Sequence, residues 1–231
     1  MNILLIAGHG AGDPGACATH NGTRFREADE TRTVVGLLAS ALDKYDVNVG
    51  VYNTAQNAYA NWQKGKLPAS VFKGYDYALE IHFNAVKAET ADGKTKGVEC
   101  YVTTSETGTK VEAAICSAIA RLGLTNRGVK KKNYSVISAA KKAGVSSALL
   151  EVCFIDDPDD MTVYLRDKAA VARAIATGIA SGFGLKLRKR TSREIVQQEA
   201  GLSDSTMDYL ASYRWGKDLL DKLAAAIGKN N

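Results

Sequence analysis

The sequence lacks the features of several common protein classes. No stretch of its 231 residues is apolar over the length needed to cross a membrane, so we expect no membrane insertion. The formal net charge of +5 is too small to indicate a nucleic-acid partner. The four cysteines lie far apart and include no Cys-x-x-Cys pair, which favours reduced, partly buried thiols over a disulfide framework.

The first residues also lack the pattern of a secretory signal peptide. Residues 2–7 are apolar, but the run is short and has no basic flank, so it predicts a buried strand. We therefore expect a protein made in the cytoplasm without a signal peptide. Its apolar and charged fractions, 45% and 24%, are typical of a globular chain that can bury a core.

Strand-like and helix-like segments alternate along residues 1–184. Short apolar or alternating segments predict strands at 2–7, 47–52, 77–82, 97–103 and 146–152. Apolar residues at helical spacing predict helices at 27–44, 107–122 and 166–183, and Asp157-Pro158 is typical of another helix start. This alternation predicts an α/β fold with a twisted, mostly parallel sheet flanked by helices. Functional sites in such folds gather at the carboxyl ends of the strands.

The composition becomes more basic and polar after this region. Residues 185–192 are predicted to be a basic linker, and 193–231 a small helical domain. Thr191 with Glu194 fits a capping box, and one longer helix is predicted at about 204–227. About 40 residues seldom form a self-sufficient core. We therefore expect this tail to pack on the main domain, to pair with another copy, or to dock on a partner.

Two of the three histidines directly follow predicted strands. His9 stands in Gly8-His9-Gly10 after strand 2–7, and His82 ends strand 77–82. A single histidine at a strand end is more often only a hydrogen-bonded polar residue. Two that reach the same sheet edge favour a zinc site, because imidazole is a preferred ligand and catalytic zinc commonly has three protein ligands.

Three carboxylates are candidates for the remaining chemistry. Glu27, at the start of helix 27–44, is well placed as the third ligand, although it could only be a favourable charge at a helix N-terminus. Glu30, one turn later, could replace it. Glu151 lies inside an apolar strand, where it is either a structural ion-pair partner or a general base with a raised pKa.

Four separated motifs together resemble the zinc-dependent N-acetylmuramoyl-L-alanine amidases. More narrowly, they resemble the amidase-3 type of bacterial wall hydrolases and of phage and prophage endolysins. The motifs are Gly8-His9-Gly10, Arg26-Glu27-Ala28-Asp29, Ile81-His82-Phe83-Asn84-Ala85 and Leu150-Glu151-Val152-Cys153-Phe154-Ile155. Their order and spacing match the family over about residues 1–184.

The resemblance implies the fold, the site and the reaction. It implies a sheet of about six strands, Zn²⁺ held by His9, Glu27 and His82, and Glu151 as the catalytic carboxylate. The implied substrate is bacterial peptidoglycan, cleaved at the amide bond between N-acetylmuramic acid and L-alanine. The sequence departs from the family in two places: Asp-Pro is missing before Gly8, with Asp13-Pro14-Gly15 following instead, and Glu80 stands where a small polar residue is common.

Other interpretations remain open at this point. The segment 10–15 formally matches the G-x-G-x-x-G dinucleotide fingerprint, although Asn21-Gly22 indicates a further turn before any helix. A non-catalytic wall-binding module, or another zinc hydrolase such as a carboxypeptidase, would share part of the pattern. His20 is expected to be exposed in a polar loop, and Asn84 either orients substrate or caps a turn.

The missing signal peptide favours a phage or prophage endolysin, which acts on the cell wall after release from the cytoplasm. In that setting the small helical domain at 193–231 is expected to target the wall or to mediate self-association through its helices.

Overall fold

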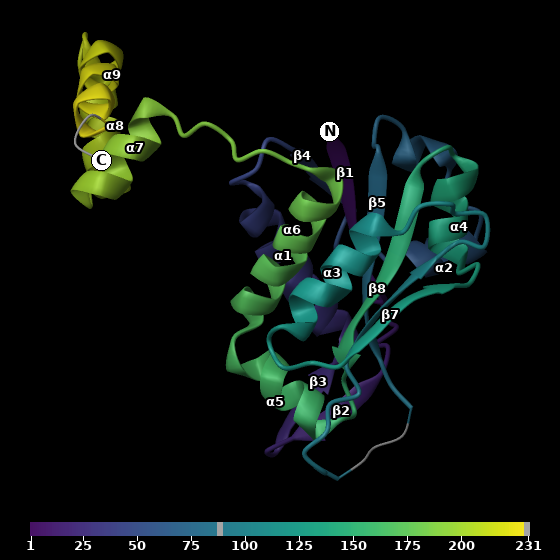
Figure 1. Cartoon of the computed structure of the whole chain (residues 1–231). Helices are drawn as coiled ribbons and strands as arrows, with labels where there is room; N and C mark the ends of the chain where they lie inside the picture. Colours follow the sequence, from purple (N-terminus) through teal and green to yellow (C-terminus); the bar gives the residue numbers. More distant parts are fainter. Residues whose placement is uncertain (87–89, 229–231) are drawn as a thin grey trace. The chain divides into compact units, whose positions relative to one another are not determined.

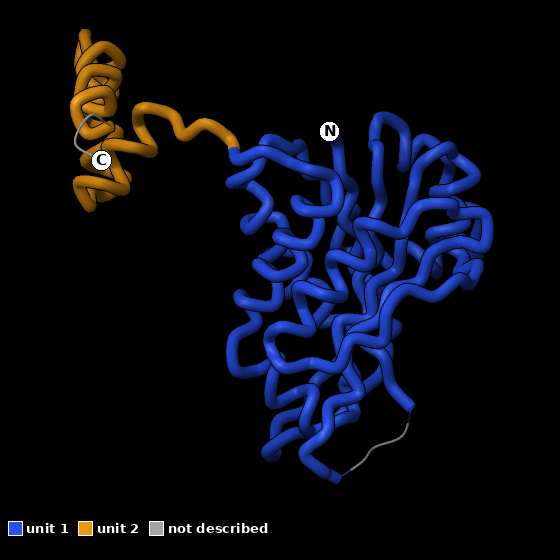
Figure 2. The backbone as a smooth tube through the Cα atoms, viewed as in Figure 1, with its two compact units in different colours: residues 1–187 blue, residues 188–231 orange. Residues whose placement is uncertain are grey.

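The computed structural model describes residues 1–86 and 90–228. The chain divides into two compact units, residues 1–187 and 188–231 (Figure 2). Each unit contains apolar residues that are buried within it. Within the described residues, no helix combines the length and the apolar character needed to span a membrane.

A six-stranded sheet forms the centre of the first unit. In sheet order the strands are β4 (Asn48–Val51), β1 (Asn2–Ala7), β5 (Tyr77–Asn84), β8 (Ser146–Phe154), β6 (Val98–Val102) and β7 (Asn126–Lys131). Strand β6 pairs antiparallel with β8, and the other pairings in this sheet are parallel. The predicted α/β class with a mostly parallel sheet is therefore confirmed.

Helices cover both faces of the sheet (Figure 1). Because side chains alternate along a strand, Ile3 and Leu5 of β1 enter one apolar cluster, while Leu4 and Ile6 enter another. The first cluster is covered by α1 (Glu27–Leu42), α3 (Lys110–Ala120) and α6 (Lys168–Phe183), and the second by α2 (Ala58–Gln63), the 3₁₀ helix Ala69–Phe72 and α4 (Ser135–Lys142).

The helix start predicted at Asp157-Pro158 and the end predicted for helix 166–183 are both present in the structure. Helix α5 (Pro158–Arg166) begins with its proline in the first turn, and the Asp157 side chain caps it by accepting a hydrogen bond from Asp160 N. Helix α6 ends at Gly184, whose φ of 68° is left-handed and suits glycine.

Three strands were not predicted from the sequence. Strand β7 lies at the sheet edge and reads Asn-Arg-Gly-Val-Lys-Lys, so it has neither an apolar run nor regular alternation. Strands β2 (Cys17–His20) and β3 (Thr23–Arg26) form a separate hairpin. Its connection is the Asn21-Gly22 turn, with φ of 49° and 76°, as expected for a two-residue hairpin loop.

The second unit contains α7 (Ser192–Ala200), α8 (Asp204–Ser212) and α9 (Gly216–Ile227). The predicted capping box of Thr191 and Glu194 is present. The prediction of one helix over 204–227 was wrong, because Tyr213 adopts extended backbone (φ −63°, ψ 141°) and separates α8 from α9. At Gly216 a Cβ atom would lie 2.3 Å from the Leu210 carbonyl oxygen, so only glycine permits this close turn.

The break between α8 and α9 gives the second unit a small core of its own. Met207 of α8 and Leu220 and Ala224 of α9 are buried together with Val196 of α7. The apolar spacing looked continuous in the sequence because both helices turn an apolar face to this one cluster.

Candidate functional site

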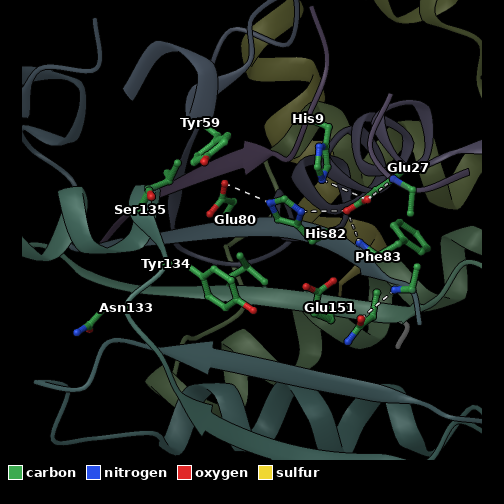
Figure 3. A pocket seen from close by; sticks show the side chains of 15 residues that line it. His9, Glu27, Tyr59, Glu80, His82, Phe83, Asn133, Tyr134, Ser135 and Glu151 are labelled. Carbon is green, nitrogen blue, oxygen red and sulfur yellow. Dashed lines mark hydrogen bonds and ion pairs between the residues drawn. The ribbon is translucent and has the colours of Figure 1, made fainter. Parts of the chain in front are cut away.

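The residues predicted as metal ligands come together at the carboxyl edge of the sheet. His9 follows β1, His82 lies near the end of the neighbouring strand β5, and Glu27 begins α1. One ligand atom from each of these residues can be chosen so that all three lie within 4.8 Å of one another (Figure 3). Parallel strands produce this arrangement because their carboxyl ends meet at one edge.

Glu27 lies at the centre of this cluster. Its Oε1 atom is 2.9 Å from His82 Nδ1, and its Oε2 atom is 3.2 Å from His9 Nε2. Burial alone would raise the pKa of Glu27, but the hydrogen bonds and charges of His82 and His9 outweigh it and lower the pKa well below its ordinary value. The site therefore presents an ionised carboxylate and two ring nitrogens that face it, a donor set that suits zinc.

An unusual backbone conformation at His9 and two glycines allow the side chains of the cluster to lie close together. His9 has a φ of 59°, which is unusual for a residue with a side chain, and Arg32 Nη2 donates a 3.0 Å hydrogen bond to its carbonyl oxygen. A Cβ atom on Gly8 would lie 2.4 Å from the His82 ring, and one on Gly15 would lie 2.7 Å from Glu27 Oε2.

Asp13 orients the ring of His9. The Asp13 Oδ2 atom lies 2.8 Å from His9 Nδ1, on the side of the ring away from Glu27. Gly15 N and Asn57 Nδ2 hold the Asp13 carboxylate by donating hydrogen bonds of 3.0 and 3.1 Å. A carboxylate on the second nitrogen of a metal-binding histidine fixes its tautomer and orientation. This role of Asp13 was not predicted, although Asp13-Pro14-Gly15, four residues after His9, was a signal for it in the sequence.

Glu80 lies beside the second nitrogen of His82. The two residues are two apart on β5, so they share one face of the strand, and Glu80 Oε1 is 3.2 Å from His82 Nε2. That nitrogen is buried and makes no hydrogen bond of good geometry to any residue that the structure describes. Burial alone would lower the pKa of His82, but the charge of Glu80 and the Glu27 hydrogen bond raise it well above its ordinary value. The excess negative charge around the histidines favours a bound cation.

Glu151 faces the same cavity from the next strand. It pairs in register with His82 across β5 and β8, and both residues line a cavity of about 510 Å³. Its Oε2 atom is buried and has no hydrogen-bond partner among the described residues. Burial raises the pKa of Glu151 to about 7; the charge of His82 opposes the shift, and nearby carboxylates including Glu27 add to it. Among residues 1–86 and 90–228 no ion pair neutralises this group, which favours a catalytic over a structural role.

Glu30 lies outside the cluster. Its Oε2 atom accepts hydrogen bonds of 2.6 Å from the Tyr164 hydroxyl and of 2.6 Å from Lys168 Nζ. The alternative in which Glu30 replaces Glu27 as the ligand therefore finds no support in the geometry.

The remaining polar candidates have different surroundings. His20 was expected to be exposed, but it is part-buried, because its Nε2 atom lies 2.7 Å from the Ile155 carbonyl oxygen. Asn84 lines the cavity; its Nδ2 donates to Glu99 Oε1 at 2.8 Å, and its Oδ1 accepts from Ala85 N at 2.8 Å. Asn84 thus caps the chain locally beside the site.

The glycine-rich segment 10–15 does not form a dinucleotide-binding turn. It folds back on itself through a 2.7 Å hydrogen bond from Gly10 N to the Asp13 carbonyl oxygen. Helix α1 begins only at Glu27, after the β2–β3 hairpin. A nucleotide site of the Rossmann type needs a helix that opens within the motif, so that interpretation was wrong.

Comparison with known proteins identifies a matching family. The sequence model of the amidase-3 family, described as N-acetylmuramoyl-L-alanine amidase, matches residues 3–181. No curated protein matches the chain.

Three solved structures illustrate the structural similarity. The putative N-acetylmuramoyl-L-alanine amidase from Neisseria meningitidis is 27% identical with a TM-score of 0.61, and the match covers 81% of this chain and 98% of that one. The catalytic domain of the CD27L endolysin targeting Clostridia difficile is 24% identical with a TM-score of 0.60, covering 78% and 97%. Cwp6 from Clostridium difficile is 22% identical with a TM-score of 0.60, and the match covers 79% of this chain but only 28% of Cwp6.

The family match spans most of the first unit and includes every residue of the cluster described above. It agrees with the resemblance that the four sequence motifs indicated. The chain therefore belongs to the N-acetylmuramoyl-L-alanine amidase family and is an enzyme of that class.

Proposed function

We propose that the chain is a zinc-dependent amidase that hydrolyses the bond between N-acetylmuramic acid and L-alanine in bacterial peptidoglycan. The observation that carries this proposal is the convergence of His9, Glu27 and His82 in a cavity that Glu151 also lines. A zinc ion held by these three residues would supply a Lewis acid for the scissile carbonyl and would make water more acidic.

Glu151 is the proton carrier in this proposal. Burial raises its pKa to about 7 without metal, and a bound cation would lower it, so the carboxylate would be ionised near neutral pH; it would accept a proton from the attacking water and then donate it to the alanine nitrogen of the leaving group. Its unpartnered Oε2 atom is available for this transfer. Asp13 keeps His9 in place through the Nδ1 atom, so that Nε2 remains directed at Glu27.

The test combines metal content with the chemistry of the product. Purified protein should hold about one zinc ion per chain, and digestion of peptidoglycan should expose new amino termini of L-alanine. A different new amino terminus would indicate another zinc hydrolase, such as a carboxypeptidase. Binding to walls without any new terminus would indicate a non-catalytic wall-binding module.

We also propose that the enzyme acts as an endolysin on the cell wall after release. Support comes from the fold that it shares with the catalytic domain of the CD27L endolysin. The second unit would then target the wall or mediate self-association, because Tyr209 and Tyr213 of this unit are 77% and 59% exposed. Lysis of intact cells by added protein, measured by turbidity, tests the endolysin role.

A further inference from the structure

An aromatic pair on the rim of the cavity has no part in the proposed hydrolysis. Tyr59 lines the cavity, and Trp62 follows it by one turn in the short helix α2. The two rings are stacked, with centroids 6.0 Å apart and planes inclined by 14°. They are 44% and 42% exposed, although large aromatic side chains gain most from burial. Two open rings beside a cavity are therefore better suited to a ligand than to the core.

Helix α2 is tied to the candidate metal site by hydrogen bonds. Asn57 caps the helix by accepting a 2.9 Å hydrogen bond from Ala60 N, and it donates a 3.1 Å hydrogen bond to Asp13 Oδ2. Asp13 in turn contacts His9. Asn57 itself is 2% exposed, and its two hydrogen bonds hold the aromatic pair at a defined position relative to the cluster.

The chemistry of α2 suits an uncharged ligand with apolar faces. The helix reads Ala-Tyr-Ala-Asn-Trp-Gln and has no charged residue within its bounds, although Lys64 follows it as the C-cap. The C–H groups on one face of a pyranose ring carry a slight positive charge, which matches the negative face of an aromatic ring. Stacked, exposed rings next to a reaction site are therefore suited to the sugars of a glycan.

The rim of the cavity opposite α2 differs from it in charge. Figure 3 shows Tyr59 and Tyr134 on either side of Glu80 and His82. Lys132 Nζ lies 4.5 Å from the centroid of the Tyr134 ring, so this rim presents a positive charge. A peptide stem carries carboxylates, whereas the sugar strand next to the scissile amide presents neutral ring faces. The lysine rim thus fits the peptide, and the α2 rim fits the glycan.

We propose that Tyr59 and Trp62 form a sugar-binding platform for the glycan strand of peptidoglycan. In this arrangement Tyr59 contacts the sugar at the mouth of the cavity and Trp62 contacts the next sugar along the strand. This inference rests on the proposed function, because it places the glycan on one side of the scissile bond.

Fluorescence provides a direct test in the full-length protein. The chain has two tryptophans, so Trp215→Phe leaves Trp62 as the only one. Titration of this variant with the tetramer of N-acetylglucosamine, which presents sugar faces without a peptide, should shift the emission of Trp62 in a saturable way. Adding Tyr59→Ala should weaken the affinity by about three- to tenfold, the range expected for the loss of one ring contact.

Kinetics on glycan-containing substrate provide a second test. Trp62→Ala should raise KM for soluble glycan–peptide chains by about three- to tenfold, with the loss in KM rather than in kcat. Leu187→Ala is the control, because Leu187 is also exposed (69%) and belongs to the first unit but is not among the residues that line the cavity; its KM should equal that of the wild type.

The outcomes separate this inference from the proposed function. If L-alanine termini are released but the emission of Trp62 does not respond to the tetramer and Trp62→Ala has a normal KM, the platform is refuted and the amidase stands. If the tetramer binds with the expected shift but no L-alanine terminus appears, the amidase proposal fails and sugar binding stands.

Discussion

Replacement of Glu151 by Gln tests the proposed chemistry most sharply. The change keeps the size of the side chain but removes the group that accepts a proton. A positioned general base contributes about 10²–10⁴ in rate, which corresponds to about 2.7–5.5 kcal/mol of transition-state stabilisation. We therefore expect kcat of Glu151→Gln to fall by this factor while zinc remains bound.

The structure indicates that this loss would not come from unfolding. The raised pKa of Glu151 means that the folded protein disfavours the ionised carboxyl, so its contribution to stability falls as pH rises from about 4.5 through about 7 in the metal-free protein. A neutral Gln removes this destabilising charge. The metal-free variant should therefore melt no lower than the metal-free wild type above pH 7.

Glu112→Gln is the matched control. Glu112 is also buried in the first unit, and burial raises its pKa even though Tyr77 donates a hydrogen bond to it. It does not line the cavity, so its replacement should change stability but not kcat. The assay is kcat and KM on soluble muropeptide, together with zinc content and a melting curve. Near-normal kcat in zinc-loaded Glu151→Gln would refute the assignment of Glu151 as the base.

The pH profile gives an independent check on the same residue. The base must be ionised to accept a proton, so kcat/KM should rise with pH through the pKa of Glu151. A bound cation favours the carboxylate, so we expect the midpoint between the ordinary value of 4.5 and about 7. This rising limb should be absent from the residual activity of Glu151→Gln; an unchanged limb would assign it to another group.

Three further predictions follow from the geometry. Glu27→Gln should lose bound zinc, whereas Glu30→Gln on the same helix should retain it, and elemental analysis of both proteins would show a misassignment if the pattern were reversed. Asp13→Asn should weaken zinc binding by about 10–100-fold in a chelator competition, because the orienting carboxylate on His9 is lost. Removal of residues 188–231 should leave melting and cleavage of soluble muropeptides intact but reduce co-sedimentation with whole walls. Simultaneous loss of stability and activity would instead mean that this unit caps the first one.

Much of the local structure could be predicted from the sequence because it depends on neighbouring residues. The apolar runs of β1 and β8 predicted strands, and Asp157-Pro158 and the Thr191–Glu194 pair predicted helix starts. The polar edge strand β7 escaped prediction because its residues at the sheet edge need no apolar pattern.

The break between α8 and α9 could not be predicted from the spacing of the apolar residues either. Two short helices that share one core keep their apolar residues at helical spacing. Only the contact of Gly216 with the Leu210 carbonyl shows where the chain turns.

The sequence by itself determined which side chains reach the carboxyl edge of the sheet, since His9 follows one predicted strand, His82 ends another, and Glu27 begins a predicted helix. Only the tertiary structure separated Glu27 from Glu30, and it favours Glu27 as the proposed ligand. One turn of α1 separates them, so Glu27 faces the histidines while Glu30 faces Tyr164 and Lys168. The register of β5 against β8 likewise brought Glu151 opposite His82. Distances between segments far apart in sequence depend on register and packing, which local patterns do not encode.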